Sequence, residues 1–314
     1  MSNLFTANDV LWAGIEVAEG VDPGLTAANC IRVLDLDVQT PNDTNAKEIS
    51  RGFFGAFPQQ ITNLRTEVNF SVCMAASGVA GTPPDYGVFL RMVGFEETLN
   101  AGTSVEYCPR SAGFETGTLY PHKDRNLHQS NGVRGNWTLT LPSGDFPLWG
   151  FNMIGSYNGP VDILTQAACT TANIVDPVIG SSTNVPRMRI GDGAGGFIDL
   201  CVSELTLDGG NDINRRQLYN CEGTSLSGRA ITGSVTYDAF AVGDFDPYAL
   251  WQDGTEVPLE FTHGIIPGNI VAGDAPAMQI LNISYGDDNG CTQHTLDFQL
   301  NPVAGNDELC FLLS

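Results

Sequence analysis

The stretch Asn136-Trp-Thr-Leu-Thr-Leu-Pro-Ser-Gly-Asp145 shows the pattern that decides the fold of this chain. Its first six residues alternate between polar and apolar, as in a β-strand with one buried face. Its last four residues are those of a tight turn, so a second strand should return beside the first. Similar runs occur at Glu67–Val72 and Ala277–Ser284, and Gly286–Gly290 contains the Asn-Gly pair of a hairpin turn. We therefore expect a mainly β protein.

Two short helices should accompany the strands. Thr82-Pro-Pro-Asp85 has the form of a T-x-x-D capping box, and apolar residues recur at helical spacing from Tyr86 to Val93 before Gly94. Asp246-Pro247 should open the second helix, which Gly254 should end.

Composition and charge exclude several classes of function. The chain has 314 residues, which suggests about two domains of roughly 150 residues each, with one compact domain as the alternative. Its net charge is −22, and only Lys47 and Lys123 are lysines, so a basic surface that binds nucleic acid is excluded. The sequence contains no apolar run long enough to span a bilayer, and we expect a soluble protein made in a cytoplasm without membrane partners.

An internal repeat organises the chain. Four features recur in the same order, at offsets that shrink along the sequence. The pairs are Leu36 with Leu205 (offset 169), Phe70 with Tyr237 (offset 167), Tyr86 with Tyr248 (offset 162) and Phe151 with Phe298 (offset 147). We interpret them as a tandem duplication with copies at 30–160 and 190–314, an N-terminal assembly arm at 1–29 and a connector at 161–189.

The motifs that could carry chemistry are weak. Gly191-Asp-Gly-Ala-Gly-Gly196 satisfies G-x-G-x-x-G, but strand-like residues follow it, so a β-turn is favoured over a cofactor loop. The acidic turns Asp208–Asp212 and Gly286–Gly290 lack the EF-hand pattern and should be solvated, with calcium binding as the alternative. We expect no cofactor.

The spacing of the cysteines and histidines indicates no metal-binding, redox or catalytic site. The eight cysteines form no C-x-x-C pair, and in a reducing cytoplasm they should be small buried apolar side chains. The four histidines match no metal or hydrolase motif. A Ser-His-Asp triad assembled from distant residues stays open, but nothing local marks a nucleophile.

The segments that carry a family resemblance run through nearly the whole chain. They are Leu11–Glu16, Gly20–Gly24, Ile31–Leu34, Arg51–Gly55, Ala76–Pro83, Gly94–Thr98 and Asn301–Leu309. With these segments the chain resembles the major tail tube proteins of bacteriophages, of the kind that builds the long tail of siphophages, in a version with two tube domains.

The resemblance implies two β-sandwich or half-barrel domains, each with a short flanking helix. It also implies a non-enzymatic virion protein, assembled in the host cytoplasm, whose rings stack into a hollow tube through which DNA passes without specific binding. Its partners would be copies of itself, a tape-measure protein and tail-end proteins. With two domains per chain, three chains would make a ring with pseudo-sixfold symmetry.

Exposed apolar residues should join one ring to the next. The candidates are Leu11 and Trp12 in the arm, Phe53, Phe54 and Phe57 in a loop, and Tyr219 in a loop at 219–227. Packing of the Phe53–Phe57 cluster onto its own domain is the alternative. The lumen should be lined by acidic and small polar side chains, which repel phosphate.

Two other functions compete with this interpretation. A non-catalytic β-sandwich module that binds carbohydrate or decorates a virion would also be acidic and rich in strands. A hydrolase with a dispersed triad is the weaker alternative. The tandem repeat and the N-terminal arm favour serial self-assembly.

Overall fold

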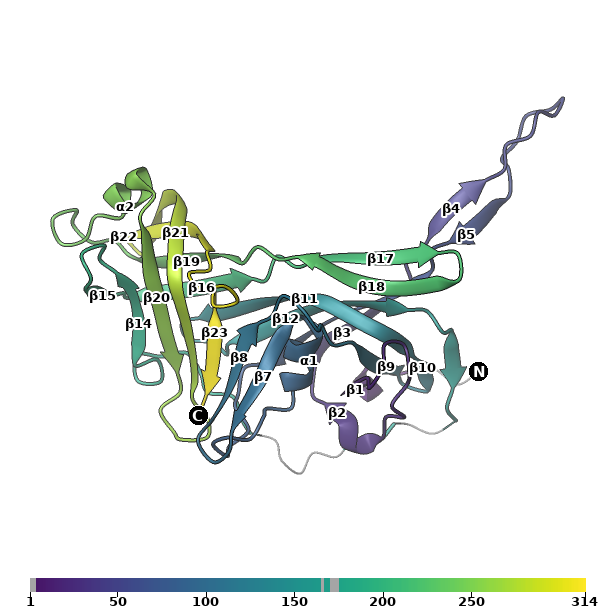
Figure 1. Ribbon diagram of the computed structural model, residues 1–314, viewed down its shortest axis with the longest axis horizontal. Coiled ribbons are helices and arrows are strands. Elements are labelled where there is room, and N and C mark those ends of the chain that lie inside the picture. Colours follow the sequence, from purple (N-terminus) through teal and green to yellow (C-terminus); the bar gives the residue numbers. More distant parts are fainter. Residues whose placement is uncertain (1–3, 165–166, 170–174) are drawn as a thin grey trace.

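The structure is a computed structural model, and it describes residues 4–164, 167–169 and 175–314. Antiparallel strands dominate it, and its two α-helices are α1 (Gly87–Met92) and α2 (Pro247–Asp253) (Figure 1). Two single-turn 3-10 helices lie at Thr6–Asn8 and Ala27–Asn29. The predicted mainly β fold class is confirmed. The start of the expected arm and parts of the expected connector lie outside the described residues.

One continuous antiparallel sheet, the central sheet, runs through both halves of the chain. Its strands in spatial order are β3 (Leu34–Gln39), β6 (Arg65–Cys73), β12 (Leu148–Ser156), β11 (Ser130–Pro142), β16 (Val202–Asp208), β19 (Thr232–Asp238), β22 (Cys291–Leu300) and β21 (Val271–Asp288). The first four strands come from the N-terminal half and the last four from the C-terminal half. The two halves meet where Thr138–Pro142 of β11 pairs with Glu204–Asp208 of β16.

A second layer of strands pairs with the N-terminal parts of β11 and β21, which extend beyond the central sheet. On β11 lies β9 (Gly117–Lys123), which also pairs with β1 (Val10–Ile15) and β10 (Asn126–His128). β2 (Cys30–Ile31) pairs with β1, and β13 (Pro160–Asp162) pairs with β10. On β21 lie β20 (Glu256–His263), followed by β14 (Arg187–Gly191) and β15 (Phe197–Asp199), and, on its other edge, β23 (Cys310–Leu313). β23 also pairs with β8 (Ser104–Pro109), and β8 pairs with β7 (Phe95–Asn100). The end of the chain therefore completes a sheet of the N-terminal half.

The core fills the space between the central sheet and this second layer. Trp137 of β11 and Trp149 of β12 lie with their ring centroids 5.5 Å apart, and Phe311 of β23 packs 5.0 Å from Trp149. All three side chains are almost fully buried. Strict alternation of burial along β6 and β12 shows why these sequences form strands, since every second residue reaches this core.

The same order of elements occurs twice along the chain. In the first half β3 leads through the hairpin β4 (Asp43–Ala46) and β5 (Gln59–Thr62) into β6 and then α1. In the second half β16 leads through the hairpin β17 (Asp212–Leu218) and β18 (Cys221–Gly228) into β19 and then α2. This recurrence supports the proposed duplication.

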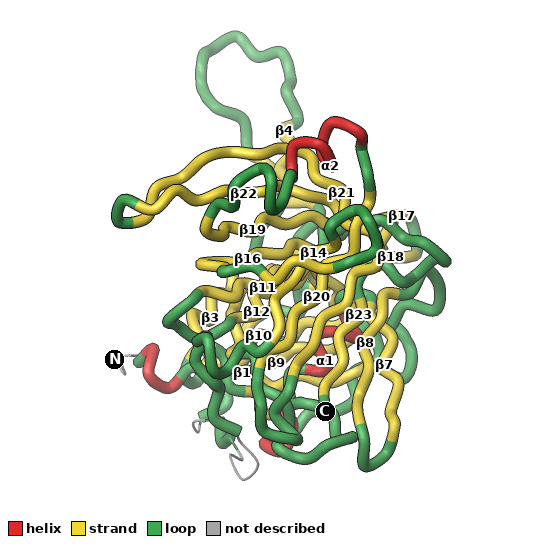
Figure 2. Tube along the Cα trace, turned by 90° about the vertical axis from the view of Figure 1, so that its left-hand side faces the viewer, coloured by secondary structure: helices red, strands yellow, loops and turns green. Residues whose placement is uncertain are grey.

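The two hairpins differ in what they contact. Hairpin β17–β18 lies across β11 and β12 of the same chain (Figure 1). Hairpin β4–β5 projects away from the body of the molecule, as both views show (Figures 1 and 2).

The two helices form where they were predicted, but only one has the predicted cap. Asp246 caps α2 by accepting hydrogen bonds from the backbone N–H groups of Tyr248 and Ala249, and Gly254 ends the helix at φ +64°. The capping box expected for α1 is absent, because Tyr86 occupies the N-cap position and no side chain caps it. Neither α-helix of the described chain has the length and apolar character needed to cross a membrane.

The interpretation of the cysteines as buried apolar residues is wrong. Cys30 pairs with Cys169, and Cys108 pairs with Cys310, in disulfides that spacing could not predict because they join residues 139 and 202 positions apart. Of the four free cysteines, Cys73 is half-buried, and Cys201, Cys221 and Cys291 are exposed.

Candidate functional site

The candidate functional surface is the face of the central sheet that points away from the core, which we call the polar face. Cross-strand neighbours share a face, so paired residues form rows. One row consists of Asp37, Asn69, Asn152 and Asn136. Another runs through Pro142, Glu204, Thr236 and Thr295. Polar side chains therefore alternate with the apolar side chains of the core.

Side-chain hydrogen bonds fix the polar face. Asn152 donates to the Glu67 carboxylate at 2.8 Å, and Asn136 donates to Asp208 at 2.8 Å. The hydroxyls of Thr206 and Ser234 lie 2.8 Å apart, and those of Thr236 and Thr295 lie 2.9 Å apart. Because these groups are already paired across strands, the face presents a preorganised polar surface with negative charge.

The polar face offers hardly any cation to a phosphate. The central-sheet strands contain no lysine, and their only arginines are Arg65 and Arg134. Arg65 lies at the start of β6, 4.0 Å from the Asp43 carboxylate. Arg134 lies under hairpin β17–β18, where its guanidinium donates to the Thr224 carbonyl. Net repulsion of a polyanion follows from this arrangement.

The predicted contact residues at Phe53, Phe54 and Phe57 lie in the loop between β4 and β5. We call residues 47–58 the aromatic loop. Phe53 is 68% exposed and Phe54 106% exposed, so the cluster does not pack onto the body of its own chain. Arg51 holds the conformation of the loop. Its guanidinium lies 4.8 Å from the ring centroid of Phe53 and 4.1 Å from the ring centroid of Phe57. It also donates hydrogen bonds to the carbonyls of residues 55 and 56.

Tyr219 occupies the corresponding place on the second hairpin. It lies at the turn between β17 and β18 and is 105% exposed. Hairpins at equivalent places in the two halves thus each carry a solvent-exposed aromatic tip.

The structure corrects the role expected for Leu11 and limits that of Trp12. Both residues belong to β1, which pairs with β9, and Leu11 is fully buried in the core, so it has no surface to offer a neighbour. Trp12 is partly buried against His122, with ring centroids 4.6 Å apart, and its indole N–H donates to the Ala168 carbonyl. The alternation in this segment is that of a strand in the sheet.

The expected arm is also anchored by a group that sequence reasoning missed. The buried carboxylate of Glu16 accepts hydrogen bonds from the hydroxyls of Thr116 and Thr118 and from the N–H of Gly132. The N–H of Gly20, four positions away, also donates to it. A lone glutamate carries no sequence signal for this role, because the Thr116, Thr118 and Gly132 donors are at least a hundred positions away.

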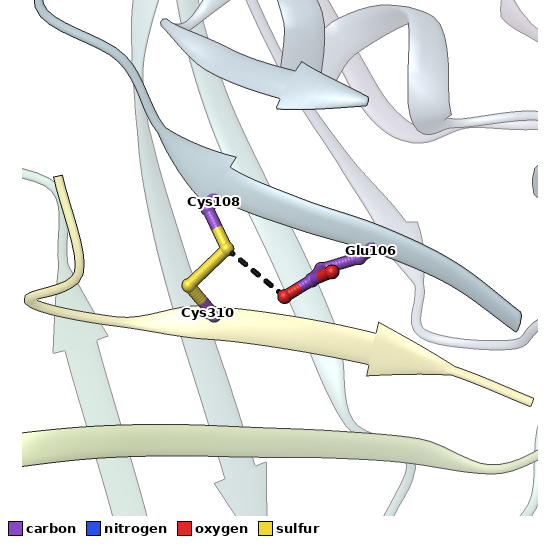
Figure 3. Close-up of side chains that lie close together, drawn as sticks. All are labelled: Glu106, Cys108 and Cys310. Atoms are coloured by element: carbon purple, nitrogen blue, oxygen red, sulfur yellow. Dashed lines mark hydrogen bonds between the residues drawn. A yellow bond between two sulfur atoms is a disulfide. The ribbon is translucent and has the colours of Figure 1, made fainter. Parts of the chain in front are cut away.

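Among the described residues, one group has the spacing of metal ligands: Glu106, Cys108 and Cys310 (Figure 3). The two sulfurs are joined in a disulfide, and the Glu106 carboxylate lies 3.4 Å from Cys108 Sγ. A disulfide has no thiolate to ligate a cation, so this group does not form a metal centre.

The remaining motifs are turns or core residues. Gly191–Gly196 forms the glycine-rich hairpin loop between β14 and β15, in which the Asp192 carboxylate accepts from the N–H groups of Ala194 and Gly196. In the described part of the chain, no histidine hydrogen-bonds a carboxylate or a hydroxyl. His263 contacts the Val178 carbonyl at 3.0 Å.

The chain matches the family described as "phage tail tube protein" over residues 6–300. No curated protein matches it. The matched range includes both halves of the central sheet, both hairpins and both α-helices.

Proposed function

The chain belongs to the phage tail tube protein family, and on this premise we propose that its copies close into rings that stack into the hollow tube of a phage tail, through which DNA passes during ejection. It is a structural component of the virion tail. By resemblance, its further partners are a tape-measure protein and tail-end proteins. The family favours this role over a carbohydrate-binding module or a hydrolase.

The observation that carries the proposal is the junction inside the chain. β11 of the first half pairs with β16 of the second half over five residues of each strand, Thr138–Pro142 with Glu204–Asp208. This pairing already joins two similar four-stranded sheets edge to edge. A ring needs the same junction between the last sheet of one chain and the first sheet of the next.

The strands that would form the second junction have open edges. β3 holds the place of β16 in the first half, and within the described chain it pairs only with β6. From Asn282 onward β21 holds the place of β11, and among the residues that the structure describes it pairs there only with β22. Their apolar residues are also incompletely covered: Leu36 and Val38 of β3 are partly buried, whereas Leu205 and Leu207 of β16 are fully buried.

Placing β3 of one chain against the end of β21 of another repeats the internal junction. Each chain then contributes two sheets, and three chains give six sheets with alternating internal and intermolecular junctions. We therefore propose a trimeric ring with pseudo-sixfold symmetry, in which the polar face lines the lumen. Half of the junctions are covalently tethered, which lowers the entropy cost of closing the ring.

Cryo-electron microscopy of assembled protein, with native mass spectrometry of released rings, tests this proposal. We expect three chains per ring and β3 paired with β21 of the neighbouring chain. Val38→Lys should prevent ring closure while leaving the chain folded by circular dichroism, because a lysine blunts an edge strand. Thr44→Lys, on exposed β4, is the matched control. Six chains per ring, or rings that form normally with Val38→Lys, would overturn the junction.

A further inference from the structure

We propose that the aromatic loop of one chain inserts into an apolar pocket of a chain in the next ring, so that each ring plugs into its neighbour. This inference rests on the proposed stacking of rings and adds the receptor site for the loop. The partner is a second copy of this chain.

The aromatic loop combines exposed apolar side chains with contacts that hold its conformation, as a preordered binding segment does. Ile49, Phe53 and Phe54 are all exposed, in a segment that projects beyond the rest of the molecule (Figure 1). The Arg51 side chain braces the loop through its two carbonyl contacts and its two phenylalanine contacts. Such preorganisation lowers the entropy cost of binding, and burial of aromatic rings supplies the free energy.

The receptor is a pocket of about 450 Å³ beside β1, β2 and the end of β6, which we call the apolar pocket. Its walls include Ile31, Val33, Val72, Ala76, Tyr86 and Pro177. The free thiol of Cys73 also lines it. A concave, mostly apolar site of this size suits one or two phenylalanine side chains.

Loop and pocket lie at opposite ends of one strand. Hairpin β4–β5 leads directly into the start of β6 at Arg65, and β6 ends at Cys73 in the pocket. Nine residues of strand separate these ends by about 30 Å. Figure 1 shows the loop at the upper right and β2, a wall of the pocket, toward the lower edge. A contact between opposite ends of identical molecules is head-to-tail, which generates an open stack.

Charge complements the apolar fit. The aromatic loop carries Lys47 and Arg51 against a single acidic residue, Glu48, so it is basic in a strongly acidic chain. The apolar pocket is lined by Asp85 and Asp176 against a single basic residue, Arg32, and by Asp9, whose carboxylate is already paired with Lys123 at 2.7 Å. Opposite net charges should orient the loop and raise its rate of docking.

Cysteine cross-linking tests the contact. In a Cys201→Ser, Cys221→Ser, Cys291→Ser background, Phe54→Cys should form a disulfide with native Cys73 of another chain when assembled tubes are oxidised. Peptide mass spectrometry should identify the 54–73 link, in tubes but not in isolated rings. Phe54→Cys with Cys73→Ser is the negative control, and Tyr219→Cys in the same background is the matched tip control. In the wild-type chain, Phe54→Ser should raise the critical concentration for tube formation at least tenfold.

The outcomes separate this inference from the proposed function. Tubes that form without a 54–73 link overturn the receptor assignment and leave the tube proposal standing. Failure of the wild-type chain to form rings or tubes overturns the tube proposal itself. If Phe54→Cys chains do not assemble, maleimide labelling of Cys73 in wild-type tubes decides the matter. Protection relative to the free chain supports docking, and equal labelling contradicts it.

Discussion

At the scale of single residues, the buried histidines make the folded chain sensitive to acid. Burial lowers the pKa of His122 to about 4, from an ordinary value of 6.5. Burial also lowers the pKa of His263 and of His294. The rings of His122 and His294 have no hydrogen-bond partner within the described chain. A proton on either ring would therefore be buried without compensation.

We expect the unfolding free energy to fall as the pH drops from about 6.5 toward 4. In this range the unfolded chain binds a proton at His122 and the folded chain does not, so acid favours unfolding. His122→Leu should remove part of this loss, on the order of 1–2 kcal/mol between pH 7 and pH 4.5. Urea unfolding at both pH values measures it. His128→Leu, at a half-buried site, is the control with a smaller effect, and equal pH dependence in wild type and His122→Leu would contradict the assignment.

Some features of single residues in the candidate site could be predicted from the sequence, and others could not. Exposure of Phe54 and Tyr219 followed from aromatic residues in turn-rich loops, and the structure places both at hairpin tips. Leu11 was misread because an alternating strand near a terminus looks like an arm until its partner β9 is known. The disulfides were missed for the same reason, since their cysteines meet only after distant strands have paired.

At the scale of elements, local signals located both helices, and only the cap of α1 was mispredicted. Asp246→Ala should lower the unfolding free energy by about 1 kcal/mol, because two N–H groups of α2 lose their acceptor. Thr82→Ala should be close to neutral, because no side chain caps α1. Thermal unfolding of the two variants beside Asp253→Ala, at the other end of α2, measures the difference. A loss at Thr82 as large as that at Asp246 would refute this account.

At the scale of the whole molecule, the mainly β class could be predicted because period-two alternation is a local property. The continuous central sheet could not, since the β11–β16 pairing depends on how the two halves meet. Similarly, repeat offsets suggested two copies, but nothing in them shows that β23 completes a sheet of the N-terminal half. The polar face was expected by its chemistry, and only the pairing registers show which residues share it.

The charge of the polar face should govern DNA passage. Glu204 and Asp297 lie on this face, on β16 and β22. Glu204→Lys with Asp297→Lys would replace repulsion of phosphate by attraction along the lumen, so ejection should slow at low salt while rings still form. The effect should fade with added salt, because the Debye length shortens from about 30 Å at 0.01 M to about 8 Å at 0.15 M. The Gln pair at the same positions removes charge without reversing it and should slow ejection less. Ejection at the wild-type rate by Lys-bearing tails at low salt would mean that the polar face lies outside the lumen, whatever the number of chains in each ring.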